Sequence, residues 1–484
     1  MSNTVVRKGC LLIMVSYLIS AVGFYFIAGD QLYFRDDQIN ALNPDAPIEE
    51  IIQGKTIQQW FTVNADEIQS ISLLFSTYNR VNTSHLRVRI IDESKSTVGQ
   101  IKVLAQNLEE YKTATFIFEA PVKIKPNQPY ELVIDSPDGV PGNAIAIWYG
   151  RSVTTARNSV DTEISENQLV RVNGEAIDGK LCFQLNTRKS LWFGQYYWYL
   201  ITGCGMIIGG YFFYTIRMNA KGRNTLALRV IGAFYKYGYL MRQLVSRDFK
   251  SKYKRSVLGV LWSFLNPLLT MMVQYVVFST LFRSGIPNFA LYLLIGIVCY
   301  SFFNESASMT LFSIVGNASL ITKVYVPKYI YPIARTISST INLVLSLVPL
   351  FAVMLITRTP LRPSILLLPF GLLCLFVLSL GIGMLLSTLM VFFRDTQFIW
   401  GVVGMLWMYA TPIFYPESII PERLMTLYKC NPLYHIIRFI RTVIINGISP
   451  EPKAYLLCIL TSIAPLLVGV LVFKKNQDKF VLNL

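Results

Sequence analysis

One carboxylate stands alone in a long apolar part of this sequence. Glu305 is the only acidic residue between Ser284 and Thr322. An ionised group inside a membrane is costly, so it normally faces protein or water and pairs with a cation. We expect Glu305 to pair with Arg335, Arg394 or a cation of segment 217–255 and to hold a gate closed. A purely structural ion pair is the alternative. The candidate gate charges are Glu305, Arg394 and Asp395.

Three cationic or titratable residues recur at every third position near the C-terminal end. His435, Arg438 and Arg441 could share one face of a helix at this spacing. Such a face could receive a lipid-linked pyrophosphate or hold lipid headgroups, and the residues alone leave both possibilities open.

Aromatic residues are frequent in the apolar stretches. Sugars present C–H faces that stack on aromatic rings, so rings along a conduit would let a polymer slide past. Belts of aromatic residues at the membrane interface need the same residue types, and this is the alternative. The candidate path residues are Trp262, Tyr275, Tyr300 and Trp407.

Several kinds of chemistry are not indicated. No phosphate-binding motif of the type G-x-x-x-x-G-K-[ST] occurs; Gly54-Lys55-Thr56 has Glu49 at the position of the first glycine. With two histidines and no Cys-x-x-Cys, we expect no metal site, no catalytic residue and no cofactor on this chain. Any ATP, with its Mg²⁺, must be hydrolysed on another subunit. Of seven cysteines only Cys182 falls within 29–190, so no disulfide framework is indicated there.

The elements that must position these residues are membrane helices. The chain of 484 residues is 53% hydrophobic and 15% charged, which is typical of a membrane protein. Because a helix needs about 20 apolar residues to span the hydrocarbon core, we expect about eight transmembrane helices. They lie in Cys10–Ala28, Leu191–Ile216, Ser256–Phe282, Ser284–Thr322 (leaving the membrane near Ser313), Thr336–Thr357, Pro363–Phe393, Thr396–Pro416 and Ala454–Phe473.

Charge distribution predicts the orientation. With the N-terminus inside, the predicted cytoplasmic segments hold 20 basic residues, whereas the outer loops of the C-terminal half hold 8. Residues 29–190 hold 21 acidic and 16 basic residues, so the net charge of +16 comes from the membrane part of the chain. There the basic residues mark the cytoplasmic side of the helices. The sequence shows no basic patch on a soluble domain, so nucleic-acid binding is not indicated. We expect residues 1–28 to be a retained first helix, because Phe26-Ile27-Ala28 is not a signal-peptidase site.

Residues 29–190 change to a strand pattern and are expected outside the cytoplasm. In Leu86-Arg87-Val88-Arg89-Ile90 apolar and charged residues alternate, as in a half-buried strand. Turn sequences such as Pro126-Asn127-Gln128-Pro129 separate the runs. We predict an all-β antiparallel sandwich or jelly roll, with further strands in 56–63, 70–76, 113–118, 130–134, 144–148 and 180–184.

Two other segments are amphipathic. Residues 217–255 are predicted to form a cytoplasmic helix at the membrane interface, with cations directed at lipid phosphates. Its alternative is a plain positively charged anchor. Residues 417–450 are expected to form re-entrant helices that dip into the outer leaflet. The interfacial cations are Arg242, Arg247, Lys250, Lys252 and Lys254.

The C-terminal half carries a series of motifs in a fixed order. Singly they are weak; in this order and at these spacings they are specific. They are Arg247-Asp248-Phe249-Lys250-Ser251-Lys252-Tyr253-Lys254, Leu258-Gly259, Trp262, Pro267, Asn317, Leu320-Ile321, Lys323, Pro327, Pro332, Phe393-Arg394-Asp395, Thr411-Pro412, Tyr415-Pro416, Asn431-Pro432 and Arg438.

From Tyr239 to the C-terminus, the chain thereby resembles the permease subunit of ABC-type exporters of O-antigen, capsule and teichoic acid. The resemblance implies a six-span permease domain in 256–484. The first 216 residues lie outside the family pattern, and the span at 191–216 is expected from its apolar composition alone. The resemblance also implies that the loop from Asn317 to Pro332 contacts a partner ATPase, whereas an ordinary cytoplasmic loop is the alternative. The coupling residues are then Asn317, Leu320, Lys323, Pro327 and Lys328.

The expected function is ATP-driven export of lipid-linked polysaccharide across the bacterial cytoplasmic membrane. The partners would be a second copy of this chain, two ATPase subunits, the polymer and membrane lipids. Two alternatives are an ABC exporter of small molecules or lipids and a membrane-bound glycan transferase. For the β domain, binding or guiding the glycan, docking another envelope protein and shielding all remain open, since fold alone does not fix function.

Overall fold

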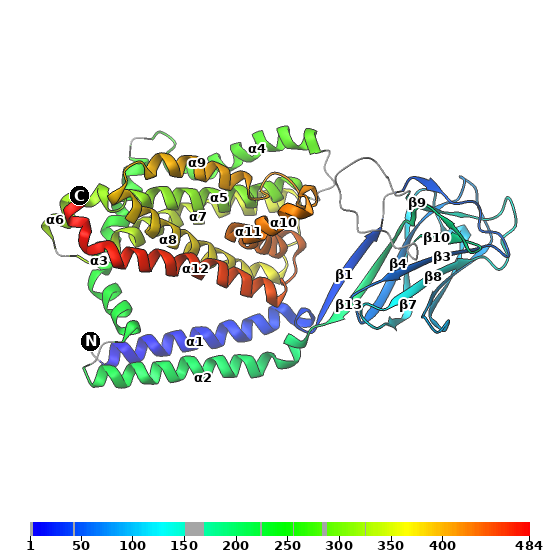
Figure 1. Ribbon diagram of the computed structural model, residues 1–484, viewed down its shortest axis with the longest axis horizontal. Coiled ribbons are helices and arrows are strands. Elements are labelled where there is room, and N and C mark those ends of the chain that lie inside the picture. The colour runs from blue at the N-terminus through cyan, green and yellow to red at the C-terminus, as the bar shows by residue number, and fades with distance from the viewer. Residues whose placement is uncertain are drawn as a thin grey trace. The chain divides into compact units, whose positions relative to one another are not determined.

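The chain forms two compact units. In the computed structural model the described residues are 3–41, 44–150, 169–222, 225–254, 256–282, 288–324 and 326–484. One unit contains Met1–Gly29 and Tyr199–Leu484, and the other contains Asp30–Trp198 (Figure 1). The second unit covers the range for which a β domain is predicted, and extends a few residues beyond it.

The Asp30–Trp198 unit is a sandwich of two antiparallel sheets, as predicted. Within its described residues one sheet has seven strands in the order β1-β13-β4-β9-β12, with β2 on β9 and β7 on β4, and the other has six in the order β11-β10-β3-β8-β5-β6. The first sheet contains β1 (Phe34–Ala41), β2 (Ala46–Pro47), β4 (Glu67–Ser76), β7 (Thr113–Lys123), β9 (Ala146–Gly150), β12 (Lys180–Leu181) and β13 (Phe183–Ser190). The second contains β3 (Thr56–Thr62), β5 (His85–Ile91), β6 (Thr97–Leu104), β8 (Pro129–Asp135), β10 (Val170–Val172) and β11 (Glu175–Ile177).

Alternation builds the core of this sandwich. Leu86, Val88 and Ile90 of β5 are at most 1% exposed and face the opposing sheet, whereas Arg87 and Arg89 face outward. Side chains of a strand point alternately to its two faces, so this pattern fixes the register. The turn at Pro126–Pro129 also forms as predicted, with Asn127 at φ 61°. Strands β10 and β11 were not predicted, because three residues are too few to show an alternating pattern.

The other unit consists of helices. Among the described residues seven are long and apolar enough to cross a membrane: Val6–Leu32, Trp192–Ala220, Gly259–Ser279, Phe289–Leu311, Ile330–Ile356, Pro363–Phe392 and Pro452–Asn483. These ranges correspond to α1 (Asn3–Ala28), α2 (Trp192–Ala220), α4 (Trp262–Phe282), α5 (Phe289–Leu311), α7 (Ile330–Ile356), the short helix η6 (Pro363–Leu367) with α8 (Leu368–Phe392), and α12 (Pro452–Asn476).

The remaining predicted span is shorter than expected. Within 396–416 the structure has α9 (Thr396–Tyr409), which has 14 residues and is followed by the turn at Thr411-Pro412. At about 1.5 Å per residue it is too short for a hydrocarbon core of about 30 Å. The chain continues into α10 (Glu422–Cys430), α11 (Pro432–Arg441) and a π-helical turn at Thr442–Asn446. These short helices occupy the segment predicted to be re-entrant.

Figure 1 shows the two ends of the helical unit. The chain termini, α3 (Leu226–Tyr253) and α6 (Ala318–Lys323) lie at one end, and α10 and α11 lie at the other. The first end carries the segments predicted to be cytoplasmic, so we call it the inner end and the opposite one the outer end.

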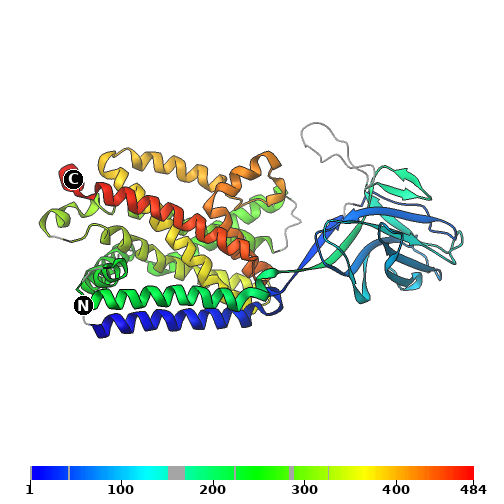
Figure 2. The same ribbon diagram turned by 60° about the horizontal axis from the view of Figure 1, so that its bottom comes forward.

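Close helix contacts hold this unit together. The α-carbon positions of Gly381 on α8 and Gly469 on α12 meet so tightly that a Cβ at Gly469 would lie 2.2 Å from the Gly381 carbonyl oxygen. Small residues allow such approach between membrane helices. Helices α1 and α2 run side by side (blue and green in Figure 2), and the Tyr17 hydroxyl of α1 donates to the Ile201 carbonyl of α2 at 2.7 Å.

Candidate functional site

Glu305 is the centre of a polar network near the inner end. Lys252 Nζ donates to Glu305 Oε1 at 2.7 Å, and Asn342 Nδ2 donates to the same oxygen at 2.6 Å. The Tyr253 hydroxyl donates to Asn342 Oδ1 at 2.9 Å and also bonds Ser263 Oγ. We call these five residues the Glu305 network. It joins α3, α4, α5 and α7, so displacement of any of the four helices must disturb it.

This network answers the question of which cation pairs with Glu305. The sequence offered three possible partners for Glu305. In the structure Glu305 pairs with Lys252, a cation of segment 217–255. Arg335 instead pairs with Asp248 at 3.1 Å. Arg394 and Asp395 are exposed in the turn between α8 and α9, and Arg394 forms no ion pair with Glu305. The Arg335 and Arg394 alternatives are therefore wrong for this conformation.

A second polar cluster lies on α3, the helix that supplies Lys252 and Tyr253 to the Glu305 network. Asp248 of α3 is only 4% exposed at its side chain and is bracketed by Arg335 of α7 and by Arg247, at 3.2 Å. The Ser338 hydroxyl is 3.5 Å from its other oxygen. Arg247 also donates to Asn317 Oδ1 at 3.1 Å, and Asn317 donates to the Ser313 carbonyl at 2.7 Å. The buried carboxylate thus fixes α3 against α7 and the start of α6.

These contacts change the interpretation of the interfacial helix. Met241 and Leu244 of α3 are buried in a core with Ile330, Tyr331 and Ala334 of α7. Helix α3 therefore packs on protein along one face instead of lying only against lipid. The five candidate cations Arg242, Arg247, Lys250, Lys252 and Lys254 are all exposed, although Arg247 and Lys252 also form the internal contacts described above.

The candidate coupling segment contains one very short helix, α6, with six residues. Asn317 is buried before it, Leu320 packs on the core and Lys323 is exposed. Pro327 and Lys328 follow, both partly buried. Lys328 Nζ donates to the Gln477 carbonyl at 2.6 Å, so the C-terminal segment holds this lysine. Of the two lysines, only Lys323 is left exposed for a partner protein.

The four candidate path aromatics do not share one environment. Trp262 and Tyr275 of α4 are 46% and 42% exposed. Tyr300 is buried, donates its hydroxyl to the Gly404 carbonyl of α9 and packs near Phe303. Trp407 is partly buried and donates to Asn431 Oδ1 at 2.8 Å. Tyr300 and Trp407 thus anchor α9, which argues against rings that line an open path.

The three outer cations lie on different faces of α11, contrary to expectation. Arg441 is 7% exposed, and its guanidinium donates to the carbonyls of Pro412, Ile413 and Tyr292 at 2.7, 3.1 and 3.1 Å. Its Cζ atom lies 3.3 Å from the centre of the Tyr292 ring. Residues six apart on an α-helix are separated by about 240°, so His435 and Arg441 cannot point the same way. Arg441 therefore secures the turn after α9 and is not available to lipid.

The two remaining residues of this set are more accessible. Arg438 is 59% exposed at its side chain, lies 3.8 Å from Glu417 and donates to the Tyr434 hydroxyl at 3.2 Å. His435 lies 2.7 Å from the Lys429 carbonyl oxygen. Glu417 also accepts from Tyr434 at 3.0 Å, so this outer acid is held by hydrogen bonds.

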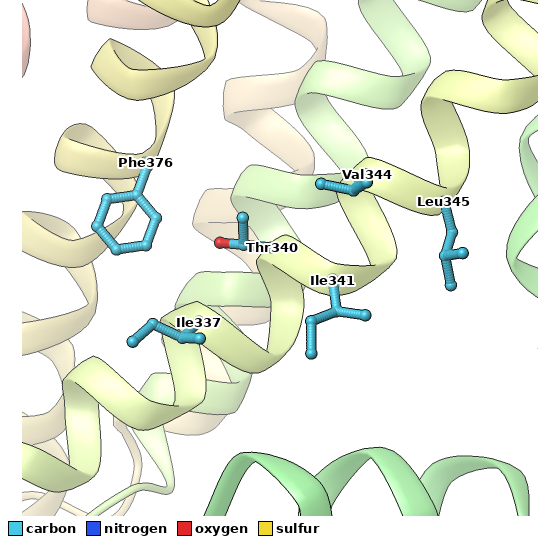
Figure 3. A pocket seen from close by; sticks show the side chains of 6 residues that line it. All are labelled: Ile337, Thr340, Ile341, Val344, Leu345 and Phe376. Atoms are coloured by element: carbon cyan, nitrogen blue, oxygen red, sulfur yellow. The ribbon is translucent and has the colours of Figure 1, made fainter. Parts of the chain in front are cut away.

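An apolar groove opens on the surface between α7 and α8 (Figure 3). Its lining is Ile337, Thr340, Ile341, Val344, Leu345 and Phe376, with a cavity volume of about 280 Å³. Apart from the hydroxyl of Thr340 the lining has no polar group. Such a groove suits hydrocarbon rather than sugar or phosphate.

Comparison with known proteins identifies the helical unit. Residues 239–445 match the family described as ABC-2 type transporter. A protein from Klebsiella pneumoniae named O-antigen export system permease protein RfbA is 32% identical over 252 residues, which are 51% of this chain and 96% of that relative. The chain belongs to the ABC-2 type transporter family.

Further relatives of this ABC-2 type permease have related names. An O-antigen export system permease protein RfbA from Myxococcus xanthus is 29% identical, over 52% of this chain and 98% of the relative. A polysialic acid transport protein KpsM from Escherichia coli is 20% identical, over 49% and 92%. The family and the apolar helices make this chain a multi-pass protein of the inner membrane. The matches cover about half of the chain.

Sequence reasoning missed some functional candidates of this ABC-2 type permease. Asp248, Tyr253 and Asn342 were not singled out, although they organise both polar clusters. Asp248 and Tyr253 lie in a recognised motif, and a lone acid among its cations was the available signal. Asn342 is a single amide in the apolar sequence of α7, and such a residue in a membrane helix usually has a partner.

Proposed function

We propose that this chain is the transmembrane subunit of an ATP-driven exporter of lipid-linked polysaccharide. The observation that carries the proposal is the match to nearly the whole length of permeases named for O-antigen export. The chain has no phosphate-binding motif for ATP, so hydrolysis belongs to a separate ATPase subunit with its own Mg²⁺. Two copies of the permease and two ATPases form the machine, with the conduit between the permeases.

Helix α3 provides a route from the ATPase to the membrane interior. Arg247 on this helix contacts Asn317 at the coupling segment, and Lys252, five residues later, contacts Glu305. A force applied to α6 at exposed Lys323 would move α3, because Arg247 of α3 donates to Asn317, the residue before α6. Displacement of α3 would then separate Lys252 from Glu305. The Glu305 network acts in this proposal as a latch on the closed state.

The substrate reaches the permease at the same helix. Exposed Arg242 and Lys250 of α3 and Lys254 directly after it offer cations to a lipid-linked pyrophosphate at the membrane surface. The groove between α7 and α8 is apolar and accommodates part of a lipid tail. In this proposal the β domain binds or guides the sugar chain outside the cytoplasm.

A transferase is less well supported. Such an enzyme would need a free acid or base on an outer loop, whereas Glu417 is occupied by Tyr434 and Arg438. An exporter of small molecules or lipids shares the helical plan, and the names of the relatives favour polysaccharide.

The test is reconstitution with the ATPase encoded beside the gene. The permease and that ATPase should co-purify, and the lipid-linked polysaccharide of the same strain should stimulate ATP hydrolysis in proteoliposomes. A strain without the permease should accumulate the polymer inside. Stimulation by phospholipid alone, with normal surface polysaccharide in the deletion strain, would contradict the proposal.

A further inference from the structure

Two exposed tyrosines lie at one end of the β sandwich, on neighbouring loops. Tyr78, after β4, is 41% exposed and Tyr111, before β7, is 56% exposed. Val81 and Val140 of nearby loops are 75% and 51% exposed. The loops are close because Tyr111 N donates to the Phe75 carbonyl at 3.2 Å. This end therefore presents apolar and aromatic surface that the core of the sandwich does not use.

The backbone at both tyrosines has a conformation that favours glycine. Tyr78 has φ 57°, Asn79 has φ 54° and Tyr111 has φ 54°. A bulky residue in this left-handed region is an outlier that costs about 1–2 kcal/mol. Since both rings are exposed, burial does not offset the cost. Strain of this kind tends to occur at functional sites, where the surrounding structure fixes it.

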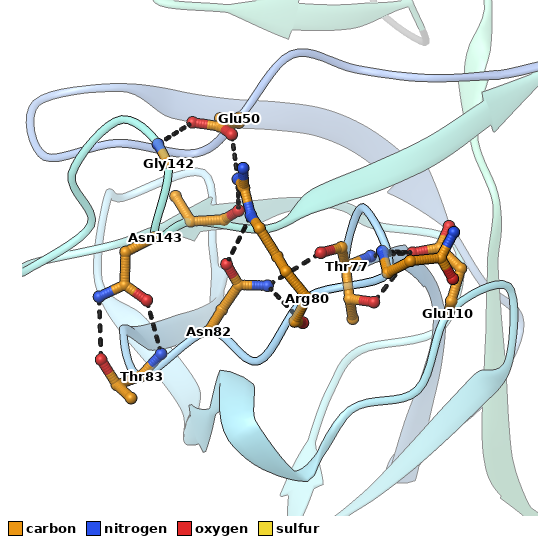
Figure 4. Close-up of polar contacts among 10 residues, drawn as sticks. Glu50, Thr77, Arg80, Asn82, Thr83, Glu110, Gly142 and Asn143 are labelled. Carbon is orange, nitrogen blue, oxygen red and sulfur yellow. Dashed lines mark hydrogen bonds and ion pairs between the residues drawn. The ribbon is translucent and has the colours of Figure 1, made fainter.

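One carboxylate fixes both loops (Figure 4). Glu110, the residue before Tyr111, accepts from the backbone N–H groups on either side of Tyr78, those of Thr77 and Asn79 at 2.5 and 3.3 Å. It also accepts from the Ser76 hydroxyl at 2.8 Å. Burial opposes its ionisation, but hydrogen bonds from Ser76 and Thr77 outweigh burial and hold the pKa of Glu110 below its usual range. The clamp is thus charged at neutral pH.

Further contacts orient the rings. The Arg80 guanidinium bonds Glu50 and the Ala144 carbonyl, and its Cζ atom lies 5.0 Å from the centre of the Tyr78 ring (Figure 4 shows the polar contacts). The Tyr111 ring packs edge to face on Trp148, with centroids 4.9 Å apart. Arg80 and Trp148 therefore fix the orientation of the two rings before a ligand binds, which lowers the entropic cost of binding.

We propose that Tyr78 and Tyr111 form a carbohydrate-binding platform that stacks on successive sugar rings of the exported polymer. This inference rests on the proposed export function and assigns the glycan contact of the β domain to this end. Tyrosine offers a flat apolar face with a polar hydroxyl at its edge, which matches a sugar ring with its hydroxyl groups. The exposed side chain of Asn79 adds an amide beside Tyr78.

Local charge favours a neutral or weakly charged glycan over a protein partner. Arg80 is neutralised by Glu50, whereas the ionised Glu110 accepts hydrogen bonds from the uncharged donors of Ser76, Thr77 and Asn79, so the negative charge of Glu110 is not neutralised and disfavours an acidic polymer. A stable protein interface needs about 800 Å² on each side, much more than two rings and two valines provide. Weak binding of a repetitive polymer needs only a few stacked rings, because neighbouring repeats raise the effective concentration.

Glycine substitution separates binding from folding. The full-length permease in lipid nanodiscs is titrated with polysaccharide released by mild acid from the surface of the strain that carries the gene. We expect the variant Tyr78→Gly/Tyr111→Gly to lose at least tenfold in affinity, measured by calorimetry. Its thermal unfolding should be unchanged or shifted upward, because glycine relieves the backbone strain. Tyr78→Phe should bind like the wild type, since the ring face is kept.

The control is Ile117→Ala on β7, which removes a side chain that is 78% exposed elsewhere on the sandwich. It should leave glycan affinity unchanged. Equal affinity of the wild type and the double glycine variant, or no binding by the wild type at millimolar sugar, would overturn the platform. The platform would also be overturned if the wild type cross-links to an envelope protein and the double glycine variant does not, while glycan binding is unchanged. If the deletion strain exports polymer normally, the export function itself fails, which is a different result.

Discussion

At the scale of single residues, the Glu305 network makes the proposed latch accessible to measurement. Glu305→Gln keeps a partner for Asn342 but removes the charge that pairs with Lys252. A half-exposed ion pair contributes about 1 kcal/mol. We therefore expect about a fivefold change in the closed-to-open ratio, seen as higher ATP hydrolysis without substrate and as reduced export. Protein yield should be unchanged.

A matched pair of lysines on α3 provides the control. Lys252→Met should raise ATP hydrolysis without substrate, as Glu305→Gln does, because Lys252 contacts Glu305. Lys250→Met should leave this substrate-free rate unchanged and lower only the stimulation by substrate, because Lys250 is a proposed substrate contact. ATP hydrolysis by reconstituted permease and ATPase is the measurement for all three. Normal substrate dependence in both Glu305→Gln and Lys252→Met would remove the pair from the mechanism.

Arg441 and Arg438 lie on one helix but should respond differently to substitution. Arg441→Lys removes the fork that serves three carbonyls. Hydrogen bonds to charged groups contribute about 1.5–3 kcal/mol each, so we expect destabilisation by about 2–4 kcal/mol. Arg438→Lys should cost less than 1 kcal/mol, since Arg438 is mostly exposed. Thermal unfolding in detergent, followed by tryptophan fluorescence, compares the two variants. Equal shifts would contradict the role of Arg441 in securing the turn after α9.

Asp135 makes the stability of the β domain depend on pH. Burial opposes its ionisation, but hydrogen bonds and charge from Arg87 and Arg89 outweigh burial and lower the pKa of Asp135 from its usual value of 3.8. The folded state then binds protons less readily than the unfolded state. The stabilisation is complete above about pH 4 and is lost as the pH falls through the lowered pKa.

The test of this linkage uses Asp135→Asn. Circular dichroism of the full chain should show a strand-unfolding transition that is constant from pH 7 to 5 and weakens below about pH 4. Asp135→Asn should be less stable at pH 7 by about 2 kcal/mol, because two arginines lose a charged partner. It should also lose less stability on acidification than the wild type. A parallel pH dependence of both proteins would show that other carboxylates dominate.

At the scale of elements, α8 and α12 depend on two glycines. A methyl group at Gly469 would lie 2.2 Å from the Gly381 carbonyl oxygen, which is backbone and cannot turn away. Gly469→Ala must therefore separate the helices, at a cost of about 3 kcal/mol. Gly401→Ala on α9 is the control, because nothing lies within 4 Å of its added methyl group. Detergent stability should fall only for Gly469→Ala, and equal stability would contradict the tight crossing.

Elements with a strong local pattern were predictable from sequence. The alternation of Leu86, Val88 and Ile90 with two arginines predicted β5, and the long apolar runs predicted the long helices. Strands β10 and β11 were missed because three residues are too few to show an alternating pattern, so these strands depend on tertiary pairing. The short α9 was missed because hydropathy does not reveal the turn that ends a helix early.

Side-chain partners were less predictable than elements. The sequence indicated that Glu305 needs a cation and included α3 among its sources, but it could not select Lys252, which is 53 residues away along the chain. Regular spacing was misleading for Arg441, because a three-residue repeat drifts around the helix. The interaction of Lys328 with the Gln477 carbonyl likewise depends on contacts between segments 149 residues apart.

At the scale of the whole molecule, the β sandwich begins and ends at one point. Strands β1 and β13 pair from Phe34 with Ser190 to Ala41 with Phe183, and Leu191 N donates to the Tyr33 carbonyl at 2.7 Å. Removal of residues 34–190, with a four-residue glycine-serine linker in their place, should leave α1 and α2 able to insert. We expect normal membrane yield and co-purification with the ATPase, with loss of glycan binding. Degradation of this variant would show that the sandwich is needed for assembly.

Adjacent ends also have an evolutionary consequence. A domain whose first and last residues meet across one hydrogen bond can be gained, lost or exchanged in a single recombination event, because the receiving chain needs no new geometry. The Klebsiella relative aligns with 51% of this chain but along 96% of its own length, so the remainder is additional to the shared permease. Lineages that change their surface sugars could therefore replace the sandwich while inheriting the transport machinery intact.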